Sequence, residues 1–240
     1  MDFKERWKEG ILNALFPPRC ILCDEVLEEK GYICSLCREK ELFMEEPSCK
    51  SCGRSILRQE ESLCGNCKRH HFSFSGGMML YQLTEEIEGA ITELKYHGRK
   101  DKGLFFGMRA GVRFQEKLKA LGIQGIIPVP IHKERRRKRG YNQAEIIGKG
   151  LEKQIGIPLY SDFLKRNKKT KALKDCSPAE RLQNLFSAMD CGELPEELKI
   201  ILLVDDIFTT GATMEACSRK LLDAGAEEVY ILAIAGRAES

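Results

Sequence analysis

ILLVDDIFTTGAT, residues 201–213, is the stretch that says most about the fold of this protein. An apolar run ends in two adjacent carboxylates, Asp205 and Asp206, and a Thr/Gly loop then leads into a helical pattern that begins at Thr213. The apolar run predicts a buried strand, and the N–H groups at a helix start, together with the loop hydroxyls, suit a phosphate dianion. Paired carboxylates can accept hydrogen bonds from neighbouring sugar hydroxyls or help to hold a hydrated divalent metal. These groups together predict a site for a ribose 5-phosphate.

The chain around this stretch, from about residue 73 onward, alternates short apolar runs with amphipathic segments. This alternation predicts an α/β fold with a largely parallel central sheet flanked by helices on both faces. The strands are expected at residues 78–83, 126–130, 201–206 and 229–235, and the helices at residues 84–96, 104–118, 142–154 and 213–224.

Eight of the eleven cysteines form four Cys-x-x-Cys pairs near the N-terminus. A two-residue gap lets both thiolates reach one tetrahedral ion, so four pairs predict two structural Zn²⁺ sites. The simplest arrangement joins neighbouring pairs, and an interleaved arrangement stays open. A disulfide scaffold and an iron–sulfur cluster are the alternatives, and the spacing fits zinc ribbons better. The expected ligands are Cys20, Cys23, Cys34, Cys37, Cys49, Cys52, Cys64 and Cys67. The remaining cysteines, Cys176, Cys191 and Cys217, are interpreted as ordinary core or loop residues.

Length and composition fit one α/β core with a smaller appendage. The chain has 240 residues, 42% hydrophobic and 31% charged, with a formal net charge of +3. We expect an N-terminal helix and double zinc ribbon over residues 1–72 and the α/β domain over residues 73–240. The helix would run from Phe3 and stop before Pro17. No apolar run is long enough to span a bilayer and no signal peptide is recognisable, so a cytoplasmic protein without membrane insertion is expected.

Two segments are rich in basic residues, and the first of them follows the strand predicted at residues 126–130. The segment 131–140, IHKERRRKRG, is interpreted as a cationic loop, and short Lys/Arg blocks of this kind either meet a bound anion or serve as exposed nucleic-acid contacts. The segment 164–184 is a second basic stretch, in which Ser177 to Glu180 predicts the start of a short helix that carries Arg181 and Asn184.

These motifs resemble two nested families. Residues 201–213 resemble the signature with which type I phosphoribosyltransferases bind phosphoribosyl pyrophosphate (PRPP). With the paired cysteines, LKYHG at 94–98 and RGYNQAE at 139–145, nearly the whole chain resembles the ComF family of competence-associated proteins. The resemblance implies a type I phosphoribosyltransferase fold behind a double zinc ribbon, and a link to DNA uptake. It also implies that the segment 164–184 holds a mobile loop over the site, where Leu173 and Cys176 depart from the usual Gln and Leu.

The resemblance also implies roles for particular residues. Asp205 and Asp206 would be the catalytic acidic pair that holds the ribose, and Mg²⁺ would bind together with PRPP. Candidates for neutralising the pyrophosphate are Lys95, Arg137 and Arg166, and one or two residues of the basic loop are expected near it. The phosphate loop would comprise Thr209, Thr210, Gly211, Ala212 and Thr213.

Three functional hypotheses follow. The first is a phosphoribosyltransferase that acts on PRPP and an unidentified base. The second is a non-catalytic protein that binds PRPP or a nucleotide. The third is an adaptor that binds single-stranded DNA through its zinc ribbons and basic segments and works with competence or DNA-processing proteins.

Overall fold

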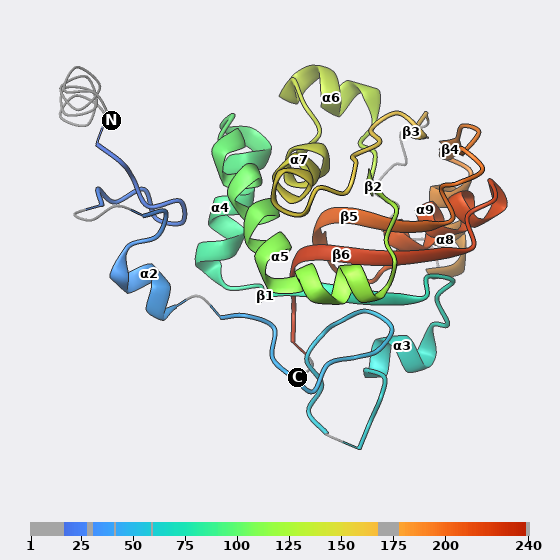
Figure 1. Cartoon of the computed structure of the whole chain (residues 1–240), viewed down its shortest axis with the longest axis horizontal. Coiled ribbons are helices and arrows are strands. Elements are labelled where there is room, and N and C mark those ends of the chain that lie inside the picture. The colour runs from blue at the N-terminus through green and yellow to red at the C-terminus, as the bar shows by residue number, and fades with distance from the viewer. Residues whose placement is uncertain (1–16, 28–30, 41, 59, 168–177, 239–240) are drawn as a thin grey trace.

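A four-stranded parallel sheet lies at the centre of the computed structural model (Figure 1), which describes residues 17–27, 31–40, 42–58, 60–167 and 178–238. The strand order is β1-β6-β5-β2, and each neighbouring pair is parallel. The predicted α/β class with a parallel central sheet is therefore confirmed. The strands are β1 (Gly76–Gln82), β2 (Gly125–Pro128), β5 (Ile200–Phe208) and β6 (Glu228–Gly236).

Helices cover both faces of this sheet, and β5 shows why. Its alternate side chains point to opposite faces, so Leu202 and Val204 belong to one hydrophobic core while Ile201 and Leu203 belong to the other. Figure 1 shows the two groups of helices apart from one another. The first core is closed by α4 (Glu85–Tyr96), α5 (Lys100–Ala120) and α7 (Gln143–Ile155), and the second by α8 (Pro178–Phe186) and α9 (Ala212–Asp223).

Helices α5 and α7 pack so closely that their contact requires glycine. A Cβ atom at Gly107 would lie 2.0 Å from the carbonyl oxygen of Ile147, and one at Gly150 would lie 2.2 Å from that of Leu104. This contact fixes α7, whose N-cap Asn142 also donates from Nδ2 to the carbonyl oxygen of Val129 at 2.9 Å. These contacts fix the C-terminal end of the segment that connects β2 to α7.

That segment is a helix, and the prediction of a loop over residues 131–140 is wrong. Helix α6 (Lys133–Arg139) has His132 as its N-cap, whose side chain accepts from the N–H of Glu134, and Gly140 as its C-cap, with φ 83°. Both ends are thus capped, and long basic side chains are good helix formers. The helix has no buried residue, so it lacks the apolar periodicity that would have predicted it.

A small antiparallel pair, β3 (Leu164–Arg166) with β4 (Met189–Cys191), was not predicted. Helix α8 lies where the short helix was expected. The predicted N-terminal helix, Ser177 and the departures at Leu173 and Cys176 lie outside the described residues.

The two cysteine segments pack on opposite sides of the α/β core. The first, residues 17–27 and 31–40 with α2 (Ser35–Glu39), joins the core of α4, α5 and α7, and its Asp24 Oδ1 lies 2.6 Å from Nη1 of Arg99. The second, residues 42–72 with α3 (Gly65–Arg69), joins the core of α9. Its first residues also cover the outer edge of β1, because the N–H of Met44 donates to the carbonyl of Leu80 at 2.9 Å. The division at residues 72 and 73 stays a prediction.

None of the helices that the structure describes is both long and apolar enough to cross a membrane.

Candidate functional site

The two adjacent carboxylates lie near the C-terminal end of the central strand β5, and Asp206 is the more deeply buried residue at 4% exposure. Its Oδ1 atom lies 2.9 Å from Nζ of Lys95 at the end of α4. Its Oδ2 atom is buried and accepts no hydrogen bond from any described residue. An acceptor left in this state costs free energy unless a ligand meets it, so Asp206 offers one oxygen to a sugar hydroxyl or a hydrated metal.

Asp205 is held in an unusual protonation equilibrium. Burial, and then the neighbouring Asp206 carboxylate, raise the pKa of Asp205 to about 8. Its Oδ1 atom also accepts from the N–H of Asp206 at 2.8 Å. The acidic pair therefore binds a proton readily, because the proton reduces the repulsion between the two carboxylates. A bound cation or a set of hydroxyl donors would stabilise the negative charges in the same way.

The phosphate loop presents free backbone donors. Among the residues that the structure describes, the N–H groups of Thr209, Thr210 and Gly211 have no acceptor. Gly211 has φ 86°, a left-handed conformation that suits glycine, and helix α9 begins directly after it. Three free donors beside the N-terminus of a twelve-residue helix suit an anion, so this loop is a candidate anion cradle.

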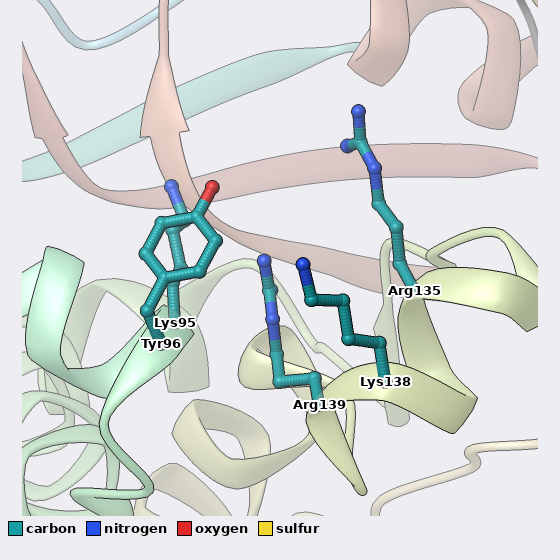
Figure 2. A pocket seen from close by; sticks show the side chains of 5 residues that line it. All are labelled: Lys95, Tyr96, Arg135, Lys138 and Arg139. Atoms are coloured by element: carbon teal, nitrogen blue, oxygen red, sulfur yellow. The ribbon is translucent and has the colours of Figure 1, made fainter.

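A pocket of about 240 Å³ lies next to Lys95. Figure 2 shows side chains from α4 and α6 that point into the same space. Tyr96 is 69% exposed, and the guanidinium carbon of Arg139 lies 5.2 Å from the centre of its ring. Four cations and one accessible aromatic ring suit an anionic ligand, or a base that carries phosphate. The lining residues are Lys95, Tyr96, Arg135, Lys138 and Arg139.

The other predicted cations are placed differently. Arg166 ends β3 beside His132, and burial together with the charge of Arg135 lowers its pKa, so Arg166 lies near the pocket's basic side chains and near Asp205. Arg137 is exposed on α6 and does not line the pocket. The structure thus brings Lys95 and Arg166 to the acidic pair and leaves Arg137 outside.

Sequence reasoning missed two groups of residues at this site. Arg135, Lys138 and Arg139 have the i, i+3, i+4 spacing of one helix face, a signal that the interpretation as a loop concealed. Arg54 and Asn66 of the second cysteine segment donate to the carbonyl oxygens of Thr209 and Thr210. No sequence signal marks these two contacts, because they join residues more than a hundred positions apart.

The cysteines form two clusters, each from neighbouring pairs, which decides between the two arrangements left open by the sequence. The four Sγ atoms of each cluster lie within 4.8 Å of one another. Sulfurs bonded to one tetrahedral Zn²⁺ at about 2.3 Å would lie about 3.8 Å apart. Cys23 and Cys34 have Sγ atoms 3.7 Å apart, and Cys52 and Cys64 have theirs 3.8 Å apart, so both clusters fit Zn²⁺.

The fold and the site define a class: an α/β protein with an N-terminal double zinc ribbon and an acidic pair followed by an anion cradle. Residues 11–68 match the family model described as a double zinc ribbon domain. Competence protein F of Haemophilus influenzae is 30% identical over 223 residues, which cover 90% of this chain and 96% of the relative. The chain belongs to the ComF family of competence proteins.

More distant relatives agree with this assignment. Competence protein ComFC of Bacillus subtilis is 25% identical, over 86% of this chain and 89% of the relative. DNA utilization protein YhgH of Escherichia coli is 24% identical, over 90% of this chain and 95% of the relative. Among solved structures, a purine phosphoribosyltransferase from Pyrococcus horikoshii covers 55% of this chain and 83% of its own, at 19% identity and a TM-score of 0.35.

Proposed function

We propose that this chain binds PRPP with Mg²⁺ at residues 205–213 and transfers the phosphoribosyl group to an unidentified base. The proposal rests on one observation: free hydrogen-bond donors and a free carboxylate oxygen lie close together at the C-terminal end of β5. Free N–H donors at Thr209, Thr210 and Gly211 suit the 5-phosphate, and the free Oδ2 of Asp206 suits a ribose hydroxyl. A phosphate near a pair of vicinal hydroxyls is the arrangement found in a sugar phosphate such as ribose 5-phosphate.

Each part of PRPP has a proposed partner. The loop from Thr209 to Thr213 holds the 5-phosphate, and Asp205 and Asp206 hold the ribose hydroxyls. Lys95, Arg166 and the cationic face of α6 meet the pyrophosphate. Asp205 and Asp206 would also hold Mg²⁺, either directly or through water, and the metal would supply charge neutralisation of the departing pyrophosphate. A metal at this position fits the structure, because Oδ2 of Asp206 is buried and has no hydrogen-bond partner among the described residues.

In the transfer, the bond from the anomeric carbon to pyrophosphate oxygen breaks, and the bonding pair leaves with the pyrophosphate. The bond from the anomeric carbon to a nitrogen of the base forms, and the proton of that nitrogen passes to solvent or to pyrophosphate. Between the two events positive charge develops on the sugar ring, and the adjacent carboxylates stabilise it. The cations of the pocket stabilise the negative charge that leaves.

The cellular role we propose is in DNA uptake, because relatives that match nearly end to end are named as competence and DNA utilization proteins. Eight zinc-binding thiolates need a reducing compartment, which supports the cytoplasm. A second candidate activity, binding of single-stranded DNA, is favoured by the exposed ring of Tyr96 among four cations.

The transferase step is tested by pyrophosphate release from PRPP and Mg²⁺, with a panel of purine and pyrimidine bases and short single-stranded oligonucleotides as acceptors. We expect release that depends on one acceptor and is lost in Asp206→Asn, with Asp223→Asn as the matched control on the exposed end of α9. Binding of PRPP without release for any acceptor would contradict transfer and favour the non-catalytic form of the site.

A further inference from the structure

The second zinc ribbon, residues 42–72, reaches the phosphate loop directly. Nη2 of Arg54 donates to the carbonyl oxygen of Thr209 at 3.1 Å, and Nδ2 of Asn66 donates to that of Thr210 at 3.4 Å. Arg54 also lies over the ring of Phe208, 5.9 Å from its centre. Two consecutive carbonyls of the loop are therefore held by side chains from a different part of the chain.

Holding these carbonyls also sets the direction of the amides. In a planar trans peptide the C=O and the N–H point in opposite directions. The carbonyl of Thr209 shares a peptide with the N–H of Thr210, and the carbonyl of Thr210 shares one with the N–H of Gly211. Because the ribbon draws both carbonyls to itself, both N–H groups point away from it, and these are two of the free donors of the cradle.

The end of the ribbon packs against the same loop. A Cβ atom at Gly211 would lie 2.8 Å from Cζ of Phe72, so the ring of Phe72 closes the space beside that residue. The N–H and Oγ of Ser73 both donate to Oε2 of Glu215, at 2.7 and 3.0 Å, and Glu215 is 1% exposed in the first turn of α9. The contact thus extends from the loop into the helix that follows it.

The cysteine cluster holds the two donors in place. Arg54 lies two residues after Cys52, and Asn66 lies between Cys64 and Cys67. The cluster itself is pressed against β1, since a Cβ atom at Gly77 would lie 2.6 Å from the backbone of Cys52. A ribbon fixed both by its ligands and by β1 can position Arg54 and Asn66 accurately.

We propose that Arg54 and Asn66 are positioning residues of the phosphate loop, so that the second zinc ribbon forms a structural part of the anion cradle. The ligand of the cradle rests on the proposed function, whereas the positioning itself does not. The described residues of the first zinc ribbon make no such contact with the loop, because they pack against α4 and α5 on the other side of the sheet.

Hydrogen–deuterium exchange tests the positioning without any ligand. The first protected amide after the loop is that of Glu215, which donates to the carbonyl oxygen of Gly211 at 2.8 Å. In Arg54→Ala and in Asn66→Ala this amide should exchange about five to ten times faster, as expected when one hydrogen bond that holds the loop is lost, while β6 is unchanged. Arg54→Lys keeps a cationic donor and should restore most of the protection. The matched control is Arg58→Ala, because the side chain of Arg58 is 77% exposed and its ion partner is Glu61 of the same ribbon. Zinc content per chain confirms that every variant is folded at its metal centres.

Ligand binding gives the second readout. Ribose 5-phosphate affinity should fall about tenfold in Arg54→Ala and in Asn66→Ala, and inorganic pyrophosphate affinity should stay constant, since it would bind at α6. A general loss of structure would weaken both ligands together. Exchange of the Glu215 amide equal to that of wild type, at full zinc content, would overturn the positioning role. Faster exchange together with no sugar phosphate binding by wild type would keep the positioning role and overturn the PRPP assignment.

Discussion

The two oxygens of Asp206 have different surroundings, and this difference is the chemical centre of the site. Oδ1 meets Lys95 Nζ at 2.9 Å, whereas Oδ2 is buried without a partner among the described residues. The neighbouring Asp205 shares the same low-dielectric environment, which raises its pKa to about 8. The sequence could predict both carboxylates and their place at a strand end. It could not predict the unequal oxygens, because these depend on Lys95 arriving from a different helix.

The raised pKa of Asp205 predicts a dependence of stability on pH. The folded chain keeps a proton on Asp205 up to about pH 8, whereas the unfolded chain releases it near the ordinary aspartate pKa of 3.8. The folded state therefore binds more protons between these values, and stability falls as pH rises through that window. Asp205→Asn removes this loss, so its melting temperature should exceed that of wild type by a few degrees at pH 9 and by less at pH 5. Calorimetric melting at both values checks this, and an equal difference at pH 5 and pH 9 would contradict the raised pKa.

Among the elements, β5 and α9 were the most predictable and α6 was the least. An apolar strand followed by a Thr/Gly turn and an amphipathic helix carries its own signal in local sequence. Helix α6 carries almost no such signal, since every residue in it is polar and no apolar periodicity is present. Gly140 can be recognised as a helix C-cap only when a helix before it is already assumed. The pair β3 with β4 joins segments about 25 residues apart, and strands of three residues are too short for periodicity to mark.

The position of each basic side chain on α6 predicts which of them contribute to anion binding in the pocket. Arg135, Lys138 and Arg139 line the pocket, and Arg137 does not. An Arg135→Ala/Arg139→Ala double variant should weaken pyrophosphate binding about tenfold to a hundredfold, because each lost charged contact removes a hydrogen bond to an ionised group. A Lys133→Ala/Arg137→Ala double variant also removes two charges from α6, and it should bind like wild type because neither residue lines the pocket. Calorimetric titration with pyrophosphate at fixed ionic strength measures both, and equal losses would show that net charge rather than geometry attracts the anion.

The whole molecule places its two zinc ribbons on opposite sides of one sheet. Cysteine spacing predicted two metal centres from the sequence, and the spacing of neighbouring pairs fits the clusters found. It could not predict that one ribbon would touch α5 while the other touched the phosphate loop, because packing between distant segments leaves no periodic signal. The N-terminal module is therefore continuous with both hydrophobic cores of the α/β domain.

The central claim is that the end of β5 and the loop after it bind PRPP, and calorimetric titration of the intact zinc-loaded chain with PRPP and Mg²⁺ tests it most directly. Wild type should bind, and the Asp205→Asn/Asp206→Asn double variant should bind at least about a hundredfold more weakly, because both carboxyl groups proposed to hold the ribose and Mg²⁺ are lost. Asp223→Asn should bind like wild type. PRPP affinity that is equal in wild type and in the double variant, or absent from both, would contradict the account.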